Sequence, residues 1–353
     1  PTGPIIEGIA STALGTALGI VDLAVSSEGT LVYVAGRESG PVTIEAVWVG
    51  RDGSVHHMTP PLRLIPGLNF YGLALSPDGT RLALDVANGK STDIWIKQLP
   101  AGPFSRLTFE GTFNSRPSWT PDGRSVLFIS NRGAMSKFAP WRQRADGSAP
   151  AERVTTGSTR EIRYVILSRD GEWLVYHELS ESGWDISAIR SGRDTSAVPL
   201  LTSKFDEMAP SLSPDGRWLA YMSGESGRNE VYVRPFPKVE DGRWQISTEG
   251  GSAPRWSHSG RELFYQVDST NAMMAASVTL APSFTAGTPH KLFDAIPQLY
   301  PSSNVPYYDV TPDDRRFIMA RVVSTDQKPG PPELVVVENF REEVRRKLAA
   351  ARQ

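Results

Sequence analysis

The stretch Ser213-Pro-Asp-Gly-Arg-Trp-Leu-Ala-Tyr221 decides the fold of this chain, because its first four residues recur along the sequence. Each copy follows a short apolar segment and precedes another. The fourth residues of successive copies lie 50, 44, 48, 45, 44 and 54 residues apart. The seven copies are Ser26-Ser-Glu-Gly29, Ser76-Pro-Asp-Gly79, Thr120-Pro-Asp-Gly123, Ser168-Arg-Asp-Gly171, Ser213-Pro-Asp-Gly216, Ser257-His-Ser-Gly260 and Thr311-Pro-Asp-Asp314.

The recurring tetrapeptide has the chemistry of a tight turn between two strands. Ser or Thr in the first place and Asp in the third can bond nearby backbone groups, and proline in the second presets φ for a type I turn. Glycine in the fourth place accepts a left-handed conformation, which Asp314 also tolerates better than most residues. A period of about 40–50 residues with several strands in each unit is typical of a β-propeller.

We therefore predict an all-β chain that forms a seven-bladed β-propeller of four-stranded antiparallel blades. Residues 5–10 form a strand-like segment at one end, and Glu333–Val337 is the third strand of a last repeat that lacks an outer strand. Pairing these two segments would let the N-terminal strand complete the last blade and leave no free edge. The alternative is a ring of six blades with one irregular insertion.

The C-terminal residues have a different pattern. Phe340, Val344 and Leu348 recur at four-residue spacing behind a possible N-cap, Asn339, which indicates a short amphipathic helix. We expect residues 1–338 to form the propeller and residues 339–353 to form this helix. It either docks on the propeller or binds a partner.

Composition narrows the function. With 37 Lys and Arg against 39 Asp and Glu, the chain has no basic excess that would indicate nucleic acid or an anionic membrane as a partner. It has no cysteine, so disulfides and thiolate metal sites are excluded. No stretch of the sequence approaches the ~20 apolar residues of a membrane span, and we expect no signal peptide in it.

The repeats resemble TolB-like, WD-like propeller repeats, on the pattern of Ser213–Tyr221 followed by Glu230-Val-Tyr-Val-Arg-Pro-Phe-Pro237. More narrowly, they are similar to the C-terminal propeller region of bacterial transmembrane serine/threonine kinases. That resemblance implies an extracytoplasmic (periplasmic or cell-envelope) sensor tethered to a membrane in the full-length protein. The sequence contains no kinase loops, no Gly-x-Ser-x-Gly elbow and no His-Glu-x-x-His motif, so a non-catalytic role is expected.

The channel mouth is the expected binding site, because the segments just before the innermost strands of a propeller converge there. Mixed Arg and carboxylate groups at this mouth could grip a peptide, a protein tail or a small ligand. His177 is better explained by packing than by a site. The predicted ligand- or partner-binding residues are Asn114, Arg116, Glu161, Arg163, Asp206, Glu207, Asn304 and Tyr307.

A metal-dependent enzyme is the alternative function. Glu161, Asp206, Glu207 and Asn114 supply oxygen atoms that suit calcium or another divalent ion in the central channel, and such an ion could assist hydrolysis of small esters, lactones or phosphoesters. Against a metal, Arg116 and Arg163 at the same mouth would repel a cation. The leading interpretation, a non-catalytic binding propeller, requires no cofactor and no catalytic residue.

Overall fold

A computed structural model of the chain describes residues 11–12, 20–21, 23–35, 43–64, 72–87, 91–133, 137–296, 299, 305–323 and 333–350. The chain divides into two compact units. One unit is Ile44–Val323, and the other joins Pro1–Thr43 to Ser324–Gln353.

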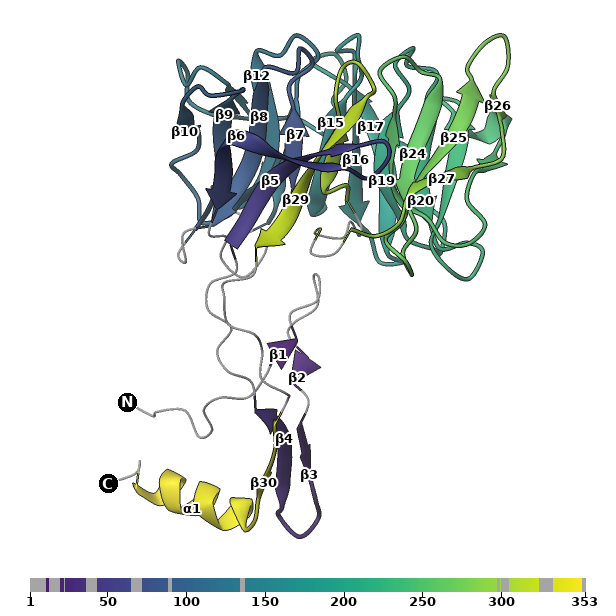
Figure 1. Cartoon of the computed structure of the whole chain (residues 1–353). Helices are drawn as coiled ribbons and strands as arrows, with labels where there is room; N and C mark the ends of the chain where they lie inside the picture. The colour runs from purple at the N-terminus through teal and green to yellow at the C-terminus, as the bar shows by residue number, and fades with distance from the viewer. Residues whose placement is uncertain are drawn as a thin grey trace. The chain divides into compact units, whose positions relative to one another are not determined.

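The unit Ile44–Val323 is built from antiparallel sheets, which we call blades 1 to 6 (Figure 1). Blade 1 contains β7 (Leu73–Leu75), β8 (Arg81–Ala87), β9 (Thr92–Gln98) and β10 (Phe104–Arg106). Blade 2 contains β11 (Asn114–Trp119), β12 (Ser125–Ser130), β13 (Ala139–Arg144) and β14 (Glu152–Arg153). Blade 3 contains β15 (Ile162–Leu167), β16 (Trp173–Leu179), β17 (Trp184–Arg190) and β18 (Val198–Leu201).

The remaining three blades follow the same plan, with the innermost strand first in the chain for blades 4 and 5. Blade 4 contains β19 (Glu207–Leu212), β20 (Trp218–Ser223), β21 (Glu230–Pro235) and β22 (Trp244–Gln245), with a 3₁₀ turn at Val239–Asp241. Blade 5 contains β23 (Ser252–Trp256), β24 (Glu262–Gln266), β25 (Met273–Thr279), β26 (Thr285–Ala286) and β27 (His290–Phe293). Blade 6 contains β28 (Tyr308–Val310), β29 (Arg316–Val323), β5 (Thr43–Gly50) and β6 (Val55–Leu64).

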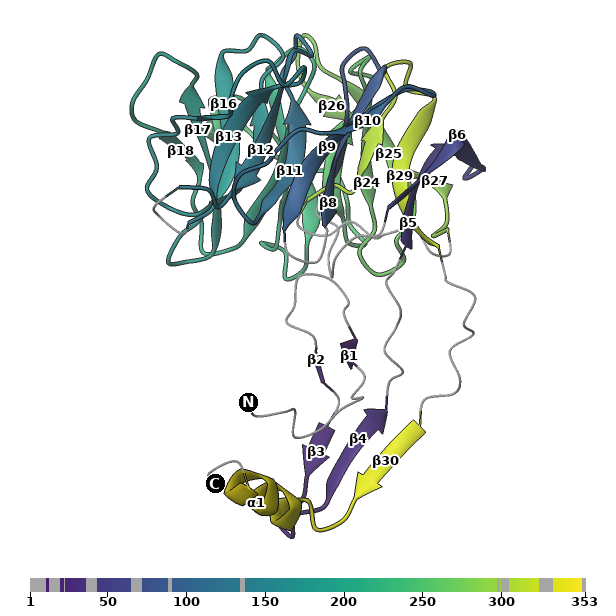
Figure 2. The ribbon, with the colours of Figure 1, turned by 90° about the vertical axis from the view of Figure 1, so that its left-hand side faces the viewer.

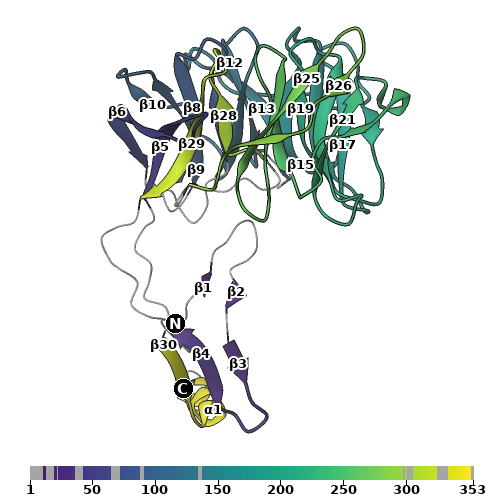
Figure 3. The ribbon, with the colours of Figure 1, turned by 45° about the vertical axis from the view of Figure 1, so that its right-hand side comes forward.

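These six blades close a ring, as Figures 2 and 3 show from two further directions. Each of blades 1 to 4 contacts the next blade, and β28 of blade 6 contacts β7 of blade 1. Blades 5 and 6 are joined by the Tyr308 hydroxyl, which donates to the carbonyl oxygen of Ala253 at 2.8 Å. Blade 6 combines two strands from the C-terminal part of the chain with two from the N-terminal part. The ring is therefore closed by N-terminal strands in the last blade, as expected, although the strands that do so are β5 and β6.

Aromatic side chains bond one blade to the backbone of its neighbour. The indole N–H of Trp119 donates to the carbonyl oxygen of Ala74 in the preceding blade at 2.9 Å. Trp256 donates in the same way to Ser211, at 3.0 Å. These contacts satisfy the buried indole N–H groups, and the two tryptophan rings pack between neighbouring blades.

The recurring turns have the predicted chemistry. In blade 1, Asp78 Oδ1 accepts hydrogen bonds from the Ser76 hydroxyl at 2.5 Å and from the Thr80 amide at 3.0 Å. These bonds, with the hydroxyl of Ser76 as the largest cause, lower the pKa of Asp78 to about 2. In the last copy Asp314 adopts φ +58°, the left-handed conformation that glycine has in the other ring copies.

The second unit contains the first copy of the turn. Its strands are β1 (Ser11–Thr12), β2 (Ile20–Val21), β3 (Leu23–Val25), β4 (Leu31–Ala35) and β30 (Glu333–Val337), followed by helix α1 (Phe340–Ala350). β1 pairs with β2, and β3, β4 and β30 form one antiparallel sheet. The Phe340 amide donates to the carbonyl oxygen of Gly29 at 2.9 Å, so the helix begins against the β3–β4 turn.

The all-β class, the four-stranded antiparallel blades and the C-terminal helix are confirmed. The described residues contain seven sheets of three or more strands, but six of them form the ring and the seventh is the β3–β4–β30 sheet of the other unit. The predicted boundary lies at residue 338, whereas the two compact units divide after Thr43 and Val323, and α1 lies in the unit that holds both terminal segments. Residues 5–10, the predicted partner of β30, lie outside the described residues.

The assembly differs from the prediction by an exchange of strands. The hairpin of the first repeat (β3, β4) takes the third strand of the seventh repeat (β30), while the hairpin of the seventh repeat (β28, β29) takes the third and fourth strands of the first (β5, β6). Both arrangements satisfy the same hydrogen-bond pattern, so strand pattern alone does not distinguish them. In the described part of the chain, no helix is long and apolar enough to cross a membrane.

Candidate ligand-binding site

The structure describes seven of the eight residues that we predicted at the channel mouth. Asn304 lies outside the described residues. Tyr307 is 5% exposed. The other six lie at or just before the innermost strands β11, β15 and β19, as expected. Their hydrogen bonds decide which of them still have capacity for a ligand.

Asn114 and Arg116 are bonded within the fold. The Asn114 side chain is fully buried and donates to Asp93 Oδ1 at 3.2 Å and to the carbonyl oxygen of Glu110 at 2.9 Å. Arg116 has φ +57° at a bulge in β11, and its guanidinium donates to the carbonyl oxygen of Arg163 at 2.7 Å. These bonds tie blade 2 to blades 1 and 3, so both residues have a structural task.

The remaining described candidates are bonded in different ways. Arg163 pairs with Glu161, and its guanidinium stacks 3.9 Å from the ring centroid of Phe138. Asp206 is exposed and accepts a hydrogen bond from the Trp184 amide at 2.9 Å. Glu207 is buried, with 4% of its surface exposed.

Sequence reasoning missed a carboxylate that recurs near the start of the third strand. Glu45, Asp93, Asp185 and Glu230 occupy this place in blades 6, 1, 3 and 4, and each is at most 3% exposed. Asp93 binds Arg106 at 2.8 Å and Asn114, and Glu230 binds Arg228 at 2.8 Å and the Gly250 amide at 3.0 Å. The sequence feature that could have revealed this carboxylate is an Asp or Glu near the N-terminal end of these predicted third strands.

Blade 3 departs from this pattern. Asp185 Oδ2 accepts from Arg160 at 3.1 Å, but Asp185 Oδ1 is buried without a hydrogen-bond partner among the described residues. Burial raises the pKa of Asp185, against the opposing effects of Ser180 and Arg160. Beside it in space, Glu207 accepts a hydrogen bond from the Ser203 hydroxyl with one oxygen, while the described atoms offer Oε2 no partner.

Glu207 titrates near neutrality. Burial is the largest cause, and nearby Asp185 and Glu225 add to it, so that the pKa of Glu207 rises to about 7 despite the Ser203 hydrogen bond. A carboxyl group with this pKa donates a hydrogen bond when protonated and accepts one when ionised. Glu207 can therefore match either kind of ligand group at the mouth.

His177 adds a donor on the neighbouring strand. The Ala209 amide donates to its Nδ1 at 3.4 Å, and burial together with Arg116 and Arg163 holds the pKa of His177 well below its usual value. The imidazole is therefore neutral with its proton on Nε2. That N–H is buried and has no acceptor among the described residues.

Arg255 supplies a second donor from blade 5. Its guanidinium lies 3.9 Å from Asp309 Oδ1, and the Tyr164 hydroxyl approaches it without completing a hydrogen bond of standard geometry. Arg255 Nε also lacks an acceptor in the described part of the chain. The Tyr164 ring lies 5.8 Å from the ring of His177. Tyr164 thus lies between two donors that lack hydrogen-bond acceptors in the described part of the chain, and we call His177, Tyr164 and Arg255 the channel donors.

A metal centre is not assembled by the described residues. No three His, Cys, Asp or Glu side chains among them lie close enough to hold one ion. The predicted oxygen set is separated by its bonds, since Asn114 binds Asp93, Glu161 binds Arg163 and Asp206 binds Trp184. Three of the four predicted oxygen donors are therefore already engaged in bonds of the fold.

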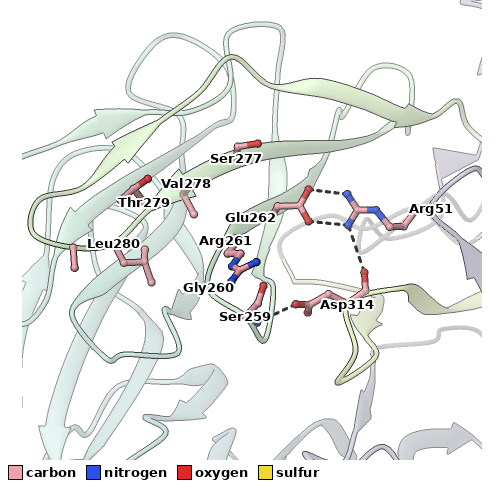
Figure 4. Close-up of a pocket in the computed structure, with 11 residues that line it drawn as sticks. Arg51, Ser259, Gly260, Arg261, Glu262, Ser277, Val278, Thr279, Leu280 and Asp314 are labelled. Carbon is pink, nitrogen blue, oxygen red and sulfur yellow. Dashed lines mark hydrogen bonds and ion pairs between the residues drawn. The ribbon is translucent and has the colours of Figure 1, made fainter.

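A further groove of the ring contains an ion pair between Arg51 and Glu262. It lies between blades 5 and 6 and has a volume of about 930 Å³ (Figure 4). Arg51 binds both oxygens of Glu262, at 2.7 and 2.8 Å, and Asp314 accepts from the Ser259 amide at 3.0 Å. These contacts join blades 5 and 6, so the polar groups that form them have a structural role.

Comparison with known proteins supports the fold. The TolB beta propeller domain matches residues 64–233. An uncharacterized protein of Agrobacterium fabrum is 26% identical over 171 residues, which are 46% of this chain and 57% of the relative. An uncharacterized peptidase of Bacillus subtilis, YuxL, is 26% identical over 169 residues, which are 45% of this chain and 23% of the relative. The chain thus covers less than two thirds of either relative.

A solved structure agrees with these matches. A protein of Agrobacterium tumefaciens assigned as TolB superposes with a TM-score of 0.62 at 18% identity, over 81% of this chain and 100% of that one. The similarity covers the whole of that structure, although so low an identity informs only on the fold. The predicted TolB-like character of the repeats is therefore confirmed for residues 64–233, and the chain shares its β-propeller fold with that structure.

Proposed function

We propose that this chain is a non-catalytic binding propeller that takes a protein, peptide or small-molecule ligand at its channel mouth. The observation that carries the proposal is the presence of the channel donors. A buried donor without an acceptor costs about 1–3 kcal/mol, so a fold that retains two of them gains when a ligand supplies the acceptors.

The channel donors favour a ligand with carboxylate or carbonyl oxygens. His177 Nε2 and Arg255 Nε both donate, and Glu207 adds a group that is half-protonated near pH 7. A peptide segment presents carbonyl oxygens at regular spacing, and its C-terminal carboxylate would pair with Arg255. A protein tail or peptide is therefore the ligand that this chemistry fits best.

The cellular context of the proposal is the extracytoplasmic part of a bacterial receptor kinase. The similarity of Ser213–Tyr221 and Glu230–Pro237 to the propeller regions of those kinases supports this context. In it, ligand binding at the propeller would be the sensing event. A metal-assisted hydrolase gains no support from the described residues, because they assemble no set of metal ligands.

The proposal is tested by selecting ligands from a displayed random peptide library on the intact chain. His177→Asn keeps an acceptor for the Ala209 amide and removes the Nε2 donor, and Arg255→Gln removes the charge. We expect selected peptides to bind the wild-type chain and to lose about tenfold or more in affinity for each variant. Arg124→Ala, at an exposed turn, is the matched control and should bind unchanged.

Two outcomes would contradict the proposal. One is that no peptide is enriched on the wild-type chain. The other is that enriched peptides bind His177→Asn and Arg255→Gln as well as they bind the wild type. Melting temperatures of all variants, measured in parallel, separate a lost contact from a lost fold.

A further inference from the structure

A small basic pocket lies between blades 2 and 3, outside the channel donors. It has a volume of about 150 Å³, and its side-chain lining includes Arg132, Lys137, Arg153 and Arg160, with Phe138 and Trp141. The two aromatic residues come from the start of β13 and the residue before it, and Arg153 comes from the paired strand β14. Strand pairing therefore fixes this pocket on one side.

The lining of the pocket is strongly one-sided in charge. It holds four cations and no Asp or Glu, although the whole chain has a net charge of −2. Arg160 is partly neutralised by Asp185 at 3.1 Å, and Lys137 donates to the carbonyl oxygen of Thr159 at 3.3 Å. Arg153 is exposed and forms no ion pair within the described ranges. Positive charge thus gathers here without a matching carboxylate in the lining.

The aromatic residues are held in place by cations. Arg132 lies 5.1 Å from the ring centroid of Trp141, and Arg163 lies 3.9 Å from that of Phe138. Phe113 packs edge-on against Phe138, with 4.9 Å between centroids. The Trp141 indole N–H is buried and finds no acceptor among the described residues. The pocket therefore combines ordered rings, positive charge and one unused donor.

We propose that this pocket binds an oxyanion, a phosphate monoester or a carboxylate, carried on an aromatic or other flat group. Arg153 and Lys137 pair with the anion, the Trp141 N–H donates to one of its oxygens, and Phe138 contacts the flat group. The volume is below the ~300–1,000 Å³ of a pocket for a drug-sized ligand, so the pocket takes one anionic group and the atoms next to it. The site is independent of the channel donors and of any ligand bound there.

The test is calorimetric titration of the whole chain with phenyl phosphate, benzoate and benzylamine at low salt. We expect at least one of the two anions to bind with a dissociation constant below roughly 10 mM, and benzylamine not to bind. The tighter of the two anions names the anionic group. Higher salt should weaken binding, since exposed charges are screened.

Matched variants separate this pocket from general surface charge. The double substitution Lys137→Ala with Arg153→Ala should weaken binding by about tenfold or more, and Trp141→Phe, which keeps a ring but removes the donor, by severalfold. Arg142→Ala removes a cation from the next position of β13, where it pairs with Glu152 at 2.7 Å, and should leave affinity within about twofold.

Three results would overturn this inference. The first is that neither anion binds below roughly 10 mM. The second is that Arg142→Ala weakens binding as much as the double substitution does. The third is that benzylamine binds as tightly as the anions. Unchanged melting temperatures for the double variant exclude unfolding as the cause of any loss.

Discussion

The buried carboxylates of the third strands differ between blade 3 and the other blades that have one. Glu45 in blade 6 binds His57 at 2.9 Å and Arg321 at 2.8 Å, one with each oxygen. Asp93 and Glu230 are bonded through both oxygens as well. Asp185 in blade 3 leaves one buried oxygen without a partner in the described part of the chain.

This difference indicates where buried polar atoms of the fold lack hydrogen-bond partners among the described residues. A fully bonded carboxylate joins strands and fixes the rim of its blade, whereas a half-bonded one costs stability. The half-bonded groups gather where blades 3 and 4 meet, with Asp185, Glu207 and His177. Buried polar groups that lower the stability of the free protein are expected at binding sites, where a ligand completes the missing hydrogen bonds.

The largest expected effect is on the fully bonded side of this comparison. Glu45→Ala removes the partner of Arg321 in the blade that closes the ring, and we expect a loss of about 3 kcal/mol in the free energy of unfolding. Urea denaturation monitored by tryptophan fluorescence measures it. A loss below about 1 kcal/mol would show that this ion pair does not hold the closing blade together.

Glu207 should behave in the opposite way. Its pKa of about 7 in the folded chain lies above its ordinary value of 4.5, so the fold favours the protonated form and stability falls as pH rises from 4.5 to 7. Glu207→Gln removes this loss. The variant should be more stable than the wild type by about 2 kcal/mol at pH 8 and little changed at pH 4.5. Equal effects at both pH values would contradict the assignment.

The same substitution at Asp185 and at Asp93 compares a half-bonded buried carboxylate with a fully bonded one. Asp185→Asn gives up one ion pair to the half-exposed Arg160 but relieves a buried charge, so we expect a change within about 1 kcal/mol. Asp93→Asn should cost about 2 kcal/mol, because both of its oxygens accept hydrogen bonds in blade 1. Thermal unfolding of the two variants compares them, and a larger loss for Asp185→Asn would reverse the account.

The smallest effect is expected for an exposed ion pair. Arg142 and Glu152 pair across β13 and β14 with side chains 45% and 62% exposed. Solvent screens such a pair, so Arg142→Ala should change stability by less than about 0.5 kcal/mol. A loss above about 1 kcal/mol in urea denaturation would mean that the outer strand of blade 2 depends on it.

Much of the fold follows from the sequence because its signals are local. The Ser-Pro-Asp-Gly turns specify hairpins through bonds within five residues, such as those between Ser76, Asp78 and Thr80. The assembly of the first and last repeats depends on which β-strand of equal pattern pairs with which. That choice is made between distant segments, β5 with β29 and β4 with β30, and the turn signals do not report it.

The positions of the candidate residues relative to the innermost strands were predictable, but their contacts were not. The segments before the innermost strands include Arg163 and Glu207, as expected, but Asn114 and Arg116 are engaged in bonds with blades 1 and 3. The importance of His177 was not predictable, because its neutral state arises from burial and its Nδ1 accepts from Ala209, 32 residues away, which leaves Nε2 without an acceptor among the described residues. Such properties come from tertiary contacts alone.

The most direct test of the central claim is the titration of the Glu207 carboxyl by carbon-13 NMR in the intact chain, assigned with Glu207→Gln. If the corner of blades 3 and 4 holds buried polar groups without partners, the carboxyl titrates with a midpoint of about 7. A midpoint near its ordinary value of 4.5 would mean that Glu207 is solvated or fully paired, and would contradict the account.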